Sequence, residues 1–427
     1  MEMRAPKGVF DVYPGAKERW QDSALWQFIE NIAKNQAELF NFKEIRTPIF
    51  EHLELFHKGV GEGSDIVSKE MYQFQDKAGR DLALRPEGTA AVIRAYLENK
   101  LYSTEKSSKL FYIGPMFRYE RQQSGRYRQH HQFGAEAIGI SSPYQDVEII
   151  DLAMSLYKAA GLNHLNLLIN CVGSPESRKN YIASLKEFLE PQFDLLSEDS
   201  KARFHKNMLR ILDSKDPQDQ KLLSGCPNII DFLDDQKKDH FDTVCSKLKE
   251  LDISYKIEPK LVRGLDYYDS TVFEIISTHD TKTPLSLGGG GRYDGLISTY
   301  GGPQIPAVGF GTGIERIIQT LIAQNNFNEK NLSLDAYIIP MQQDQFSHAY
   351  QLAHTLRQHN LSVDIDLMGR KLKNAIPQAS HQGARFAIIL GEDELKQGLY
   401  NLKNLVTRQE LDLKKDAIVD YISKHSM

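Results

Sequence analysis

The sequence lacks several features that whole classes of protein require. Only three cysteines occur, Cys171, Cys226 and Cys245, and no two of them form a CxxC pair. This argues against a disulfide scaffold or a structural zinc site and favours a reducing compartment. No apolar run approaches the roughly 18 residues that a membrane helix needs, and residues 1–8 lack the apolar centre of a signal peptide. We therefore expect a cytoplasmic protein that does not enter a membrane.

An excess of basic residues is also missing. Lys and Arg number 52 and Asp and Glu number 57, which gives a formal net charge of −5. This charge argues against a protein that coats DNA by charge alone, although a local basic patch could still bind nucleic acid. The 427 residues are 41% hydrophobic and 26% charged. This composition is typical of folded protein, and at roughly 150 residues per domain the length predicts two or three domains.

The first part of the chain mixes helical and extended patterns. Apolar residues between Leu25 and Ile32 recur at i, i+3, i+4 and i+7, which predicts a helix over 17–40. An extended stretch over 43–49 follows. Pro48 limits that part of it to a strand end or a sheet edge, because proline has no backbone N–H to donate.

Two short apolar runs, 109–118 and 133–140, flank the polar, arginine-rich stretch 119–132. We expect two antiparallel strands joined by a long basic loop, a kind of loop that is usually functional or mobile. A helix over 143–160 follows. Residues 175–250 are rich in Lys, Asp, Glu and Leu at helical spacing, which predicts an all-helical insertion that interrupts the sheet.

Extended character returns after the insertion. The glycine run Gly288–Gly291 is expected to follow the third strand of this part, and a helical stretch is expected from Tyr293. A further helix is predicted over 313–323. The predicted strands are 254–259, 271–277, 284–288 and 308–312.

The polar stretch 324–331 reads as a linker. Beyond it, strands and helices alternate in the order βαβαβ, which implies a parallel sheet with right-handed crossovers in a separate domain of 333–427. The predicted strands are 334–340, 361–366 and 385–390. The predicted helices are one around 346–356 and one over 371–382.

The strongest chemical signal is the basic loop. Between Arg118 and His131 there are four Arg and one Glu, a local net charge of +3 in an acidic protein. Arginine suits bidentate recognition of phosphate and keeps its charge. A solvated hairpin tip would have the same composition, so the loop alone leaves both interpretations open.

Two further segments carry weaker signals. Residues 309–316, GFGTGIER, read as a strand, small residues and a helix start, where backbone can approach an anion. Packing alone explains such a turn equally well, and the run is neither a Walker loop nor a Rossmann fingerprint. In Arg85–Thr89, the Glu87 carboxylate and Thr89 hydroxyl could hold an ammonium group, or could only cap a helix.

Taken in order, these segments resemble the motifs of class II aminoacyl-tRNA synthetases. Pro48 corresponds to the first motif, Phe117–Glu120 to the second and Gly311–Arg316 to the third. The runs LVRGLDYY (261–268) and GGGRYDGL (289–296) are similar to the two signature segments of histidyl-tRNA synthetases. The resemblance covers nearly the whole chain, from Pro6-Lys7-Gly8 and Asp11 onward.

The resemblance implies an α+β catalytic domain with an antiparallel sheet over 1–325, carrying the helical insertion, and an α/β anticodon-binding domain over 333–427. It implies a histidine–tRNA ligase. Such an enzyme activates L-histidine with ATP and Mg²⁺ to histidyl-adenylate and pyrophosphate, and then transfers the histidyl group to the 3′ end of tRNA(His). A homodimer is expected, because in the family the first motif builds the two-fold interface. No motif identifies the Mg²⁺ ligands.

The resemblance also assigns roles to residues. Arg118 would bind the α-phosphate of ATP, Arg316 the γ-phosphate, and Arg263 would lie between the histidine carboxylate and the α-phosphate. Glu87, Thr89 and Gln132 would hold the amino group of histidine. Glu136 and Tyr268 would bond the two imidazole nitrogens. The remaining implied contacts are Tyr267 and Tyr293, which line the histidine pocket, and Glu120, Arg126 and His130 on the ATP side.

The chain departs from the family in places. His130 stands where the family usually has a phenylalanine that stacks on adenine, and Arg121–Gly125 lacks the usual Pro and Lys. Residues 333–427 contain 11 Lys and Arg and 11 Asp and Glu. The best local RNA-binding candidate there is therefore a patch at Arg370, Lys371 and Lys373, for which a solvated helix start is the rival explanation.

A non-enzymatic alternative is a regulatory subunit of ATP phosphoribosyltransferase, which resembles the catalytic core. Such subunits lack the C-terminal domain and lose motif residues. Here residues 333–427 are present, and so are Arg118, Arg263 and Arg316. The enzyme is therefore the favoured interpretation.

Overall fold

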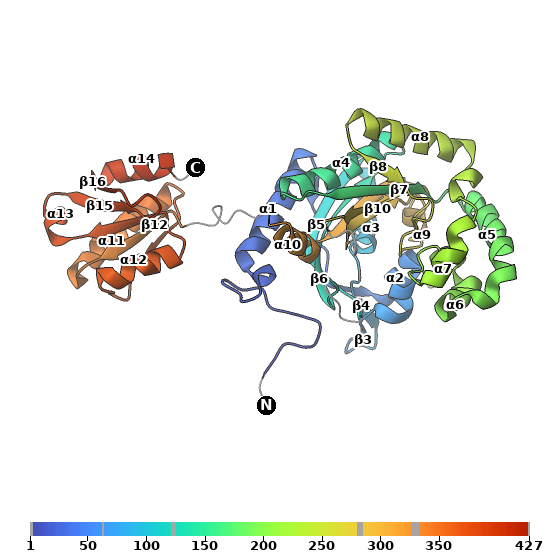
Figure 1. Cartoon of the computed structure of the whole chain (residues 1–427), viewed down its shortest axis with the longest axis horizontal. Coiled ribbons are helices and arrows are strands. Elements are labelled where there is room, and N and C mark those ends of the chain that lie inside the picture. Colours follow the sequence, from blue (N-terminus) through green and yellow to red (C-terminus); the bar gives the residue numbers. More distant parts are fainter. Residues whose placement is uncertain (1–2, 62–63, 121–124, 280–284, 326–333, 426–427) are drawn as a thin grey trace. The chain divides into compact units, whose positions relative to one another are not determined.

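A computed structural model describes residues 3–61, 64–120, 125–279, 285–325 and 334–425. The chain divides into two compact units, residues 1–327 and residues 328–427, each described by itself (Figure 1). Among the described residues, no helix is both long and apolar enough to cross a membrane.

The first unit is built on an eight-stranded sheet with the order β1-β5-β6-β11-β10-β9-β7-β8. Only the outermost pairs, β1 with β5 and β7 with β8, are parallel. The predicted antiparallel sheet is therefore confirmed. The strands are β1 (Lys43–Glu44), β5 (Ser108–Phe117), β6 (Gln129–Ile138), β7 (Leu165–Cys171), β8 (Tyr255–Ile257), β9 (Thr271–Ser277), β10 (Leu285–Arg292) and β11 (Ala307–Gly313).

The predicted hairpin around the basic loop is confirmed, with a shorter loop than expected. β5 and β6 pair from Ser108 opposite Ile138 to Phe117 opposite Gln129. Strand β6 thus begins at Gln129, four residues before the predicted start, because its polar first residues still pair with β5. Of the connection, residues 121–124 lie outside the described residues.

Helices cover one face of this sheet and bury its main hydrophobic core. Leu25, Ile150 and Ile317, one from each of three of these helices, are buried there. The first helix begins at Ser23 and not at residue 17, because the Asp22 side chain accepts a hydrogen bond from the Ala24 amide (2.9 Å) and so caps it. The helices are α1 (Ser23–Leu39), α4 (Pro143–Ala159), α8 (Asp235–Glu250) and α10 (Ile314–Ala323).

A smaller sheet with the order β2-β4-β3 and two helices precede β5 in the sequence. The predicted extended stretch over 43–49 forms a strand only at Lys43–Glu44, and Pro48 lies between β1 and β2, where no N–H is required. These elements are β2 (Phe50–His52), α2 (Leu53–Val60), β3 (Gln73–Gln75), β4 (Asp81–Leu84) and α3 (Thr89–Glu98).

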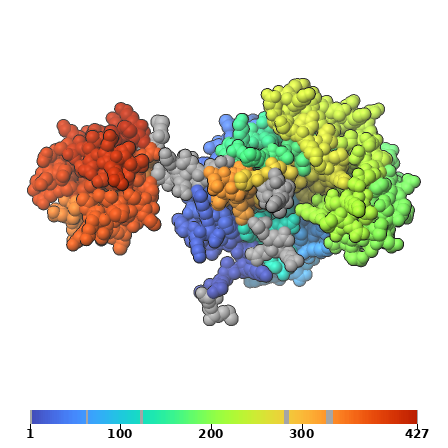
Figure 2. All heavy atoms as spheres, viewed as in Figure 1, coloured from blue at the N-terminus to red at the C-terminus, as the bar shows by residue number. Residues whose placement is uncertain are grey.

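The insertion is helical, as predicted. The elements described within residues 175–250 are α5 (Pro175–Leu189), α6 (Glu198–Lys206), α7 (Pro217–Leu222), α8 and short 3-10 turns. Asp219, which is completely buried, accepts hydrogen bonds from the hydroxyls of Ser197, Ser200 and Ser214, each at 2.6 Å. In Figure 2 the insertion, green to yellow, forms a continuous part of the visible surface.

The glycine run departs from the prediction. Gly288–Gly291 does not follow a strand but lies within β10, paired on both sides with β9 and β11. Neighbouring backbone comes so close that a Cβ atom at Gly290 would overlap the Gly309 carbonyl oxygen. The helix expected from Tyr293 is only α9 (Leu296–Thr299). Pro284, in the predicted strand 284–288, lies outside the described residues.

The second unit contains a five-stranded sheet with the order β13-β12-β14-β15-β16. The predicted parallel arrangement holds for the first three strands, whereas β15 and β16 add antiparallel pairs that were not predicted. One apolar cluster contains residues of α11 and α14, and a second contains residues of α12. The elements are β12 (Ala336–Pro340), α11 (Phe346–Gln358), β13 (Val363–Ile365), α12 (Leu372–His381), β14 (Phe386–Leu390), α13 (Glu392–Lys396), β15 (Leu399–Asn404), β16 (Glu410–Lys414) and α14 (Lys415–His425).

Candidate active site

A pocket of about 950 Å³, including its open mouth, lies over strands β6, β10 and β11 of the first unit. Twelve of the thirteen site residues expected from the sequence line it, and they come from five separate stretches of the chain. The exception is Glu136, whose carboxylate contacts two of the lining residues, Thr89 and Tyr293. The lining residues are Glu87, Thr89, Arg118, Glu120, Arg126, His130, Gln132, Arg263, Tyr267, Tyr268, Tyr293 and Arg316.

Three arginines from distant segments converge on this pocket. Arg118 follows β5 and donates to the Pro86 carbonyl (2.8 Å), and Arg316, in the first turn of α10, donates to the carbonyls of Gly125 (3.1 Å) and Ser286 (2.6 Å). Arg263 donates to the Glu274 carboxylate (3.1 Å), while its Nε is buried without a hydrogen-bond partner. The arrangement leaves guanidinium donors directed at a pocket, which suits a polyanionic ligand.

The positive field of this cluster acts on its neighbours. Burial lowers the pKa of His130 well below its usual value, and the charges of Arg118 and Arg316 lower it further. The His130 imidazole is therefore neutral near pH 7. A neutral, planar ring beside a cluster of guanidinium groups can stack on an aromatic ligand without adding charge.

The other end of the pocket is built around two carboxylates. Glu87 is 2% exposed, and it accepts hydrogen bonds from the amides of Thr89 (2.7 Å) and Ala90 (2.8 Å), so it caps α3 as well as lining the pocket. Glu136 is 1% exposed; its two oxygens accept hydrogen bonds from the Thr89 hydroxyl (2.7 Å) and the Tyr293 hydroxyl. Burial raises the pKa of Glu136 to about 8.

Aromatic rings complete this end. Tyr267 packs against Tyr268 and Tyr293, with ring centroids 4.7 and 5.3 Å apart. Tyr267 and Tyr268 lie in an irregular segment before β9 and are not strand residues. Gln132 donates to the Tyr112 hydroxyl (2.9 Å). This end of the pocket is therefore aromatic and lined by hydroxyl groups, which fits a small planar ligand with hydrogen-bonding edges.

Several site residues were not predicted. Glu315, which is 1% exposed, accepts hydrogen bonds from the His131 backbone amide (2.8 Å) and lies 3.0 Å from the His131 Nδ1, and so joins α10 to β6. Tyr112 bridges Gln132 and Glu136 from β5. Glu315 lay within a recognised motif, but its partner on another strand could be found only from the strand order. Tyr112 carries no separate sequence signal.

A resident metal site is not evident from the side chains. Among the residues that the structure describes, no group of three or more His, Cys, Asp or Glu could hold a metal ion. One pocket carboxylate, Glu120, has a buried Oε2 that accepts no hydrogen bond, with the Arg126 guanidinium 3.4 Å away. A single carboxylate together with substrate phosphates is the arrangement typical of Mg²⁺.

An antiparallel sheet that carries three convergent arginines beside a carboxylate-and-tyrosine pocket, in a chain with a separate α/β unit, defines a class II aminoacyl-tRNA synthetase. Family comparisons agree. The sequence model described as Histidyl-tRNA synthetase matches residues 26–317, and that described as Anticodon binding domain matches residues 335–425. The chain belongs to the histidyl-tRNA synthetase family.

Individual relatives support this assignment. The chain is 47% identical to the histidine–tRNA ligase of Protochlamydia amoebophila (strain UWE25) over 98% of this chain and 99% of the relative. It is 44% identical to that of Bacillus subtilis (strain 168), covering 98% of each. The crystal structure of apo S. aureus histidyl-tRNA synthetase matches with a TM-score of 0.80 and 36% identity, covering 99% of this chain and 100% of the other.

Proposed function

We propose that this chain activates L-histidine with ATP, forming histidyl-adenylate and pyrophosphate, and then transfers the histidyl group to the 3′ end of tRNA(His). The observation that carries the proposal is the convergence of Arg118, Arg263 and Arg316 on one pocket, beside the Glu136–Tyr293 group. The first step brings a carboxylate onto a polyphosphate, so the site must neutralise like charges while it aligns them.

The ATP side of the pocket contains Arg118 and Arg316. In our assignment Arg118 binds the α-phosphate and Arg316 the γ-phosphate, with Arg126 and Glu120 at the mouth. The backbone contacts of Arg118 to Pro86 and of Arg316 to Ser286 support fixed guanidinium positions. Arg263 stabilises the charge that develops between the histidine carboxylate and the α-phosphate; its unpartnered Nε supports this role. His130 takes the adenine-stacking position.

The histidine side contains the remaining assigned residues. Glu87, Thr89 and Gln132 bind the amino group, and Tyr267 and Tyr293 enclose the imidazole. Glu136 and Tyr268 hydrogen-bond the ring nitrogens. A site that pairs both nitrogens leaves its own polar groups unpaired with a ligand lacking them, which gives discrimination on the order of 10⁴–10⁵ without an editing step.

We assign Mg²⁺ to the triphosphate side, with Glu120 as its protein ligand. The Glu120 Oε2, which accepts no hydrogen bond from the described residues and lies 3.4 Å from the Arg126 guanidinium, supports this assignment. When bound, Mg²⁺ would neutralise charge on the phosphates. The arginines and Glu120 would then hold the nucleotide in line with the histidine carboxylate.

The remaining assignments concern partners and location. We propose that residues 1–325 form the catalytic domain and residues 333–427 the domain that binds the anticodon arm of tRNA, with the patch Arg370, Lys371 and Lys373 in contact with RNA. Arg370 pairs with Asp366 (2.6 Å), which leaves the two lysines as the better candidates. We also propose that the enzyme works in the cytoplasm.

We propose a homodimer built on the first motif. Next to Pro48, the side chains of Ile49 and Phe50 are 45% and 53% exposed, and Phe50 packs on Phe74, which is 42% exposed. Such a group of exposed apolar residues is typical of an interface. Sedimentation at micromolar concentration should give twice the mass of the chain, whereas Phe50→Glu should give the single chain.

The proposed activity is tested by histidine-dependent exchange between pyrophosphate and ATP in the presence of Mg²⁺, followed by charging of tRNA(His). Exchange with histidine and none with other amino acids is the expected result. Absence of exchange with purified protein would refute the proposal. The regulatory-subunit alternative would predict co-purification with a phosphoribosyltransferase. The match of an anticodon-binding model to residues 335–425 favours the enzyme.

A further inference from the structure

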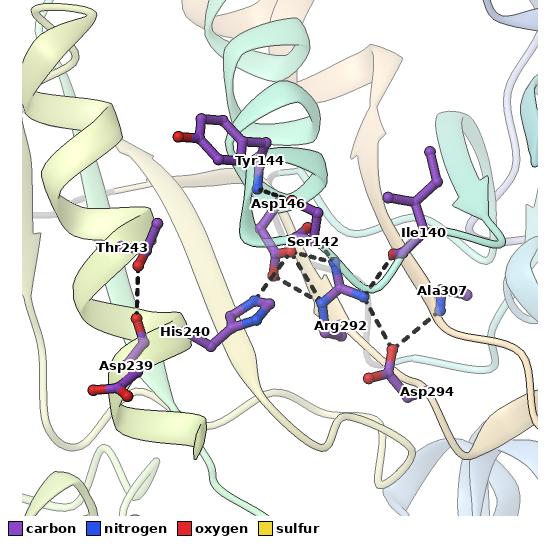
Figure 3. A network of polar contacts seen from close by, with 10 residues as sticks. All are labelled: Ile140, Ser142, Tyr144, Asp146, Asp239, His240, Thr243, Arg292, Asp294 and Ala307. Atoms are coloured by element: carbon purple, nitrogen blue, oxygen red, sulfur yellow. Dashed lines mark hydrogen bonds and ion pairs between the residues drawn. The ribbon is translucent and has the colours of Figure 1, made fainter. Parts of the chain in front are cut away.

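Arg292 is almost completely buried at the end of β10, with 1% of its surface exposed. Figure 3 shows its guanidinium inside a ring of oxygen atoms. It donates to the carbonyls of Ile140 (3.0 Å) and Ser142 (3.2 Å) and to the carboxylates of Asp146 (3.0 Å) and Asp294 (3.1 Å). None of these contacts reaches the pocket, yet the next residue along the chain, Tyr293, lines it.

The main partner of Arg292 is equally buried. Asp146, in the first turn of α4, is 1% exposed, and its carboxylate also lies 3.3 Å from the His240 Nε2 on α8. Burial opposes the charge of Asp146, but the close contact with His240 and the charge of Arg292 outweigh it and lower the pKa of Asp146. A buried ion pair of this kind contributes little net stability compared with apolar residues of the same size. Its value must therefore lie in what it holds in place.

What the pair holds is the turn that carries Tyr293. Asp294 accepts from Arg292 and also from the Ala307 amide (3.1 Å), and the Tyr293 amide donates to the Ala307 carbonyl (2.8 Å). On the other side, Asp269 accepts from the Gly295 amide (2.9 Å). The backbone on both sides of Tyr293 is thus fixed to β11 and to the segment before β9.

The fixed turn directs the Tyr293 hydroxyl at Glu136. One oxygen of Glu136 accepts from Tyr293 and the other accepts from Thr89. A continuous series of contacts therefore leads from Asp146 through Arg292, Tyr293 and Glu136 to Thr89. It ends at the part of the pocket that we assign to histidine, and it does not include the arginines that we assign to ATP.

We propose that Arg292 and Asp146 are positioning residues for the amino-acid half of the pocket, acting through Tyr293 on Glu136. Lysine cannot replace Arg292, because an ammonium group cannot reach two carboxylates and two carbonyls in one plane. His240, on the helix that ends the insertion, is the third member of the group. This inference rests on the proposed function, since it names what the pair positions.

The test compares Asp146→Asn and Arg292→Lys with Glu148→Gln in the full-length enzyme. Glu148 lies on the same helix but pairs with Lys109 and Gln145, away from the pocket. Pyrophosphate exchange gives KM for histidine and for ATP, and a burst titration gives the fraction of active sites. For Asp146→Asn and Arg292→Lys we expect the histidine KM to rise at least tenfold and the ATP KM to change less than twofold. For Glu148→Gln we expect no change in either KM.

A purely structural role would lower the active fraction or the melting temperature and leave the histidine KM within twofold; that result would overturn the proposal. If Arg292→Lys does not fold, Asp146→Asn decides alone. Tyr293→Phe supplies a second readout. If Arg292 acts through Tyr293, the double variant Arg292→Lys/Tyr293→Phe should raise the histidine KM no more than the more severe of the two single variants. A rise equal to the product of the two single effects would contradict the proposed route. Failure of the proposed function can be told apart from failure of the positioning role, because the wild-type protein would then show no histidine-dependent exchange at all.

Discussion

Replacing Arg263 with alanine is the most direct perturbation of the proposed chemistry. The side chain is 20% exposed, donates once to Glu274, and keeps a buried Nε without a partner. If that free donor serves the charge that develops at the α-phosphate, its loss should cost about 3–4 kcal/mol of transition-state stabilisation, or about 10²–10³ in rate. Single-turnover formation of histidyl-adenylate, followed by quenched flow, measures this directly.

The fold should tolerate the Arg263→Ala change. Glu274 is 25% exposed and keeps its bond from the Ser286 hydroxyl, so the carboxylate is not left buried and unpaired. Glu274→Gln is the matched control, because it removes the charge partner while Arg263 itself remains. We expect it to slow adenylate formation less than tenfold. A rate for Arg263→Ala within threefold of wild type, with normal histidine and ATP binding, would refute the assigned role.

Three other perturbations separate the parts of the molecule. Deletion of residues 333–427 should leave histidine-dependent pyrophosphate exchange within a few-fold of wild type and weaken charging of tRNA(His); equal charging by the truncated chain would contradict the proposed role of that unit. Glu136→Gln should change how stability depends on pH. Burial raises the pKa of Glu136 to about 8, so the folded protein keeps a proton that the unfolded chain releases above about pH 4.3. Wild type should therefore lose stability relative to Glu136→Gln as pH rises from about 5 to 8, and urea unfolding with a constant difference across that range would count against the buried carboxyl. Asp219→Ala removes an acceptor shared by three serine hydroxyls, two of them on buried residues, and should destabilise the insertion by roughly 2–4 kcal/mol, seen as faster amide exchange in α6 and α7 while exchange in β5 and β6 is unchanged.

Much of the fold follows from patterns within short windows of sequence. The helix containing Leu25 and Ile29, the β5–β6 hairpin and the first three strands of the second unit all have apolar spacing that predicts them. Strands β15 and β16 were missed, because they are short strands in which most residues are exposed or half-buried. A weak apolar pattern predicts nothing until a neighbouring strand provides the surface on which the strand pairs.

The site was predictable in membership but not in contacts. The motif resemblance gave thirteen residues, and the pocket contains twelve of them. It gave Glu136 a ligand contact but not the hydrogen bonds that the structure shows, in which its carboxylate accepts from the hydroxyls of Thr89 and Tyr293. Whether a side chain touches ligand or another side chain depends on strand order and register, and no local pattern encodes either.

The glycines of β10 and β11 show how that order shapes the pocket. A Cβ atom at Gly309 would overlap the Glu136 carboxylate, one at Gly311 would overlap the Gln132 amide, and one at Gly289 would lie 2.8 Å from an Arg263 nitrogen. Each glycine therefore leaves room for a functional side chain that belongs to another segment. Read along the chain, such a run looks like a turn. In the sheet, these glycines form a surface without side chains, and side chains from β6 and from the segment before β9 pack directly against it. The glycines that weaken the strand prediction for this segment are thus the residues that leave room for the functional side chains.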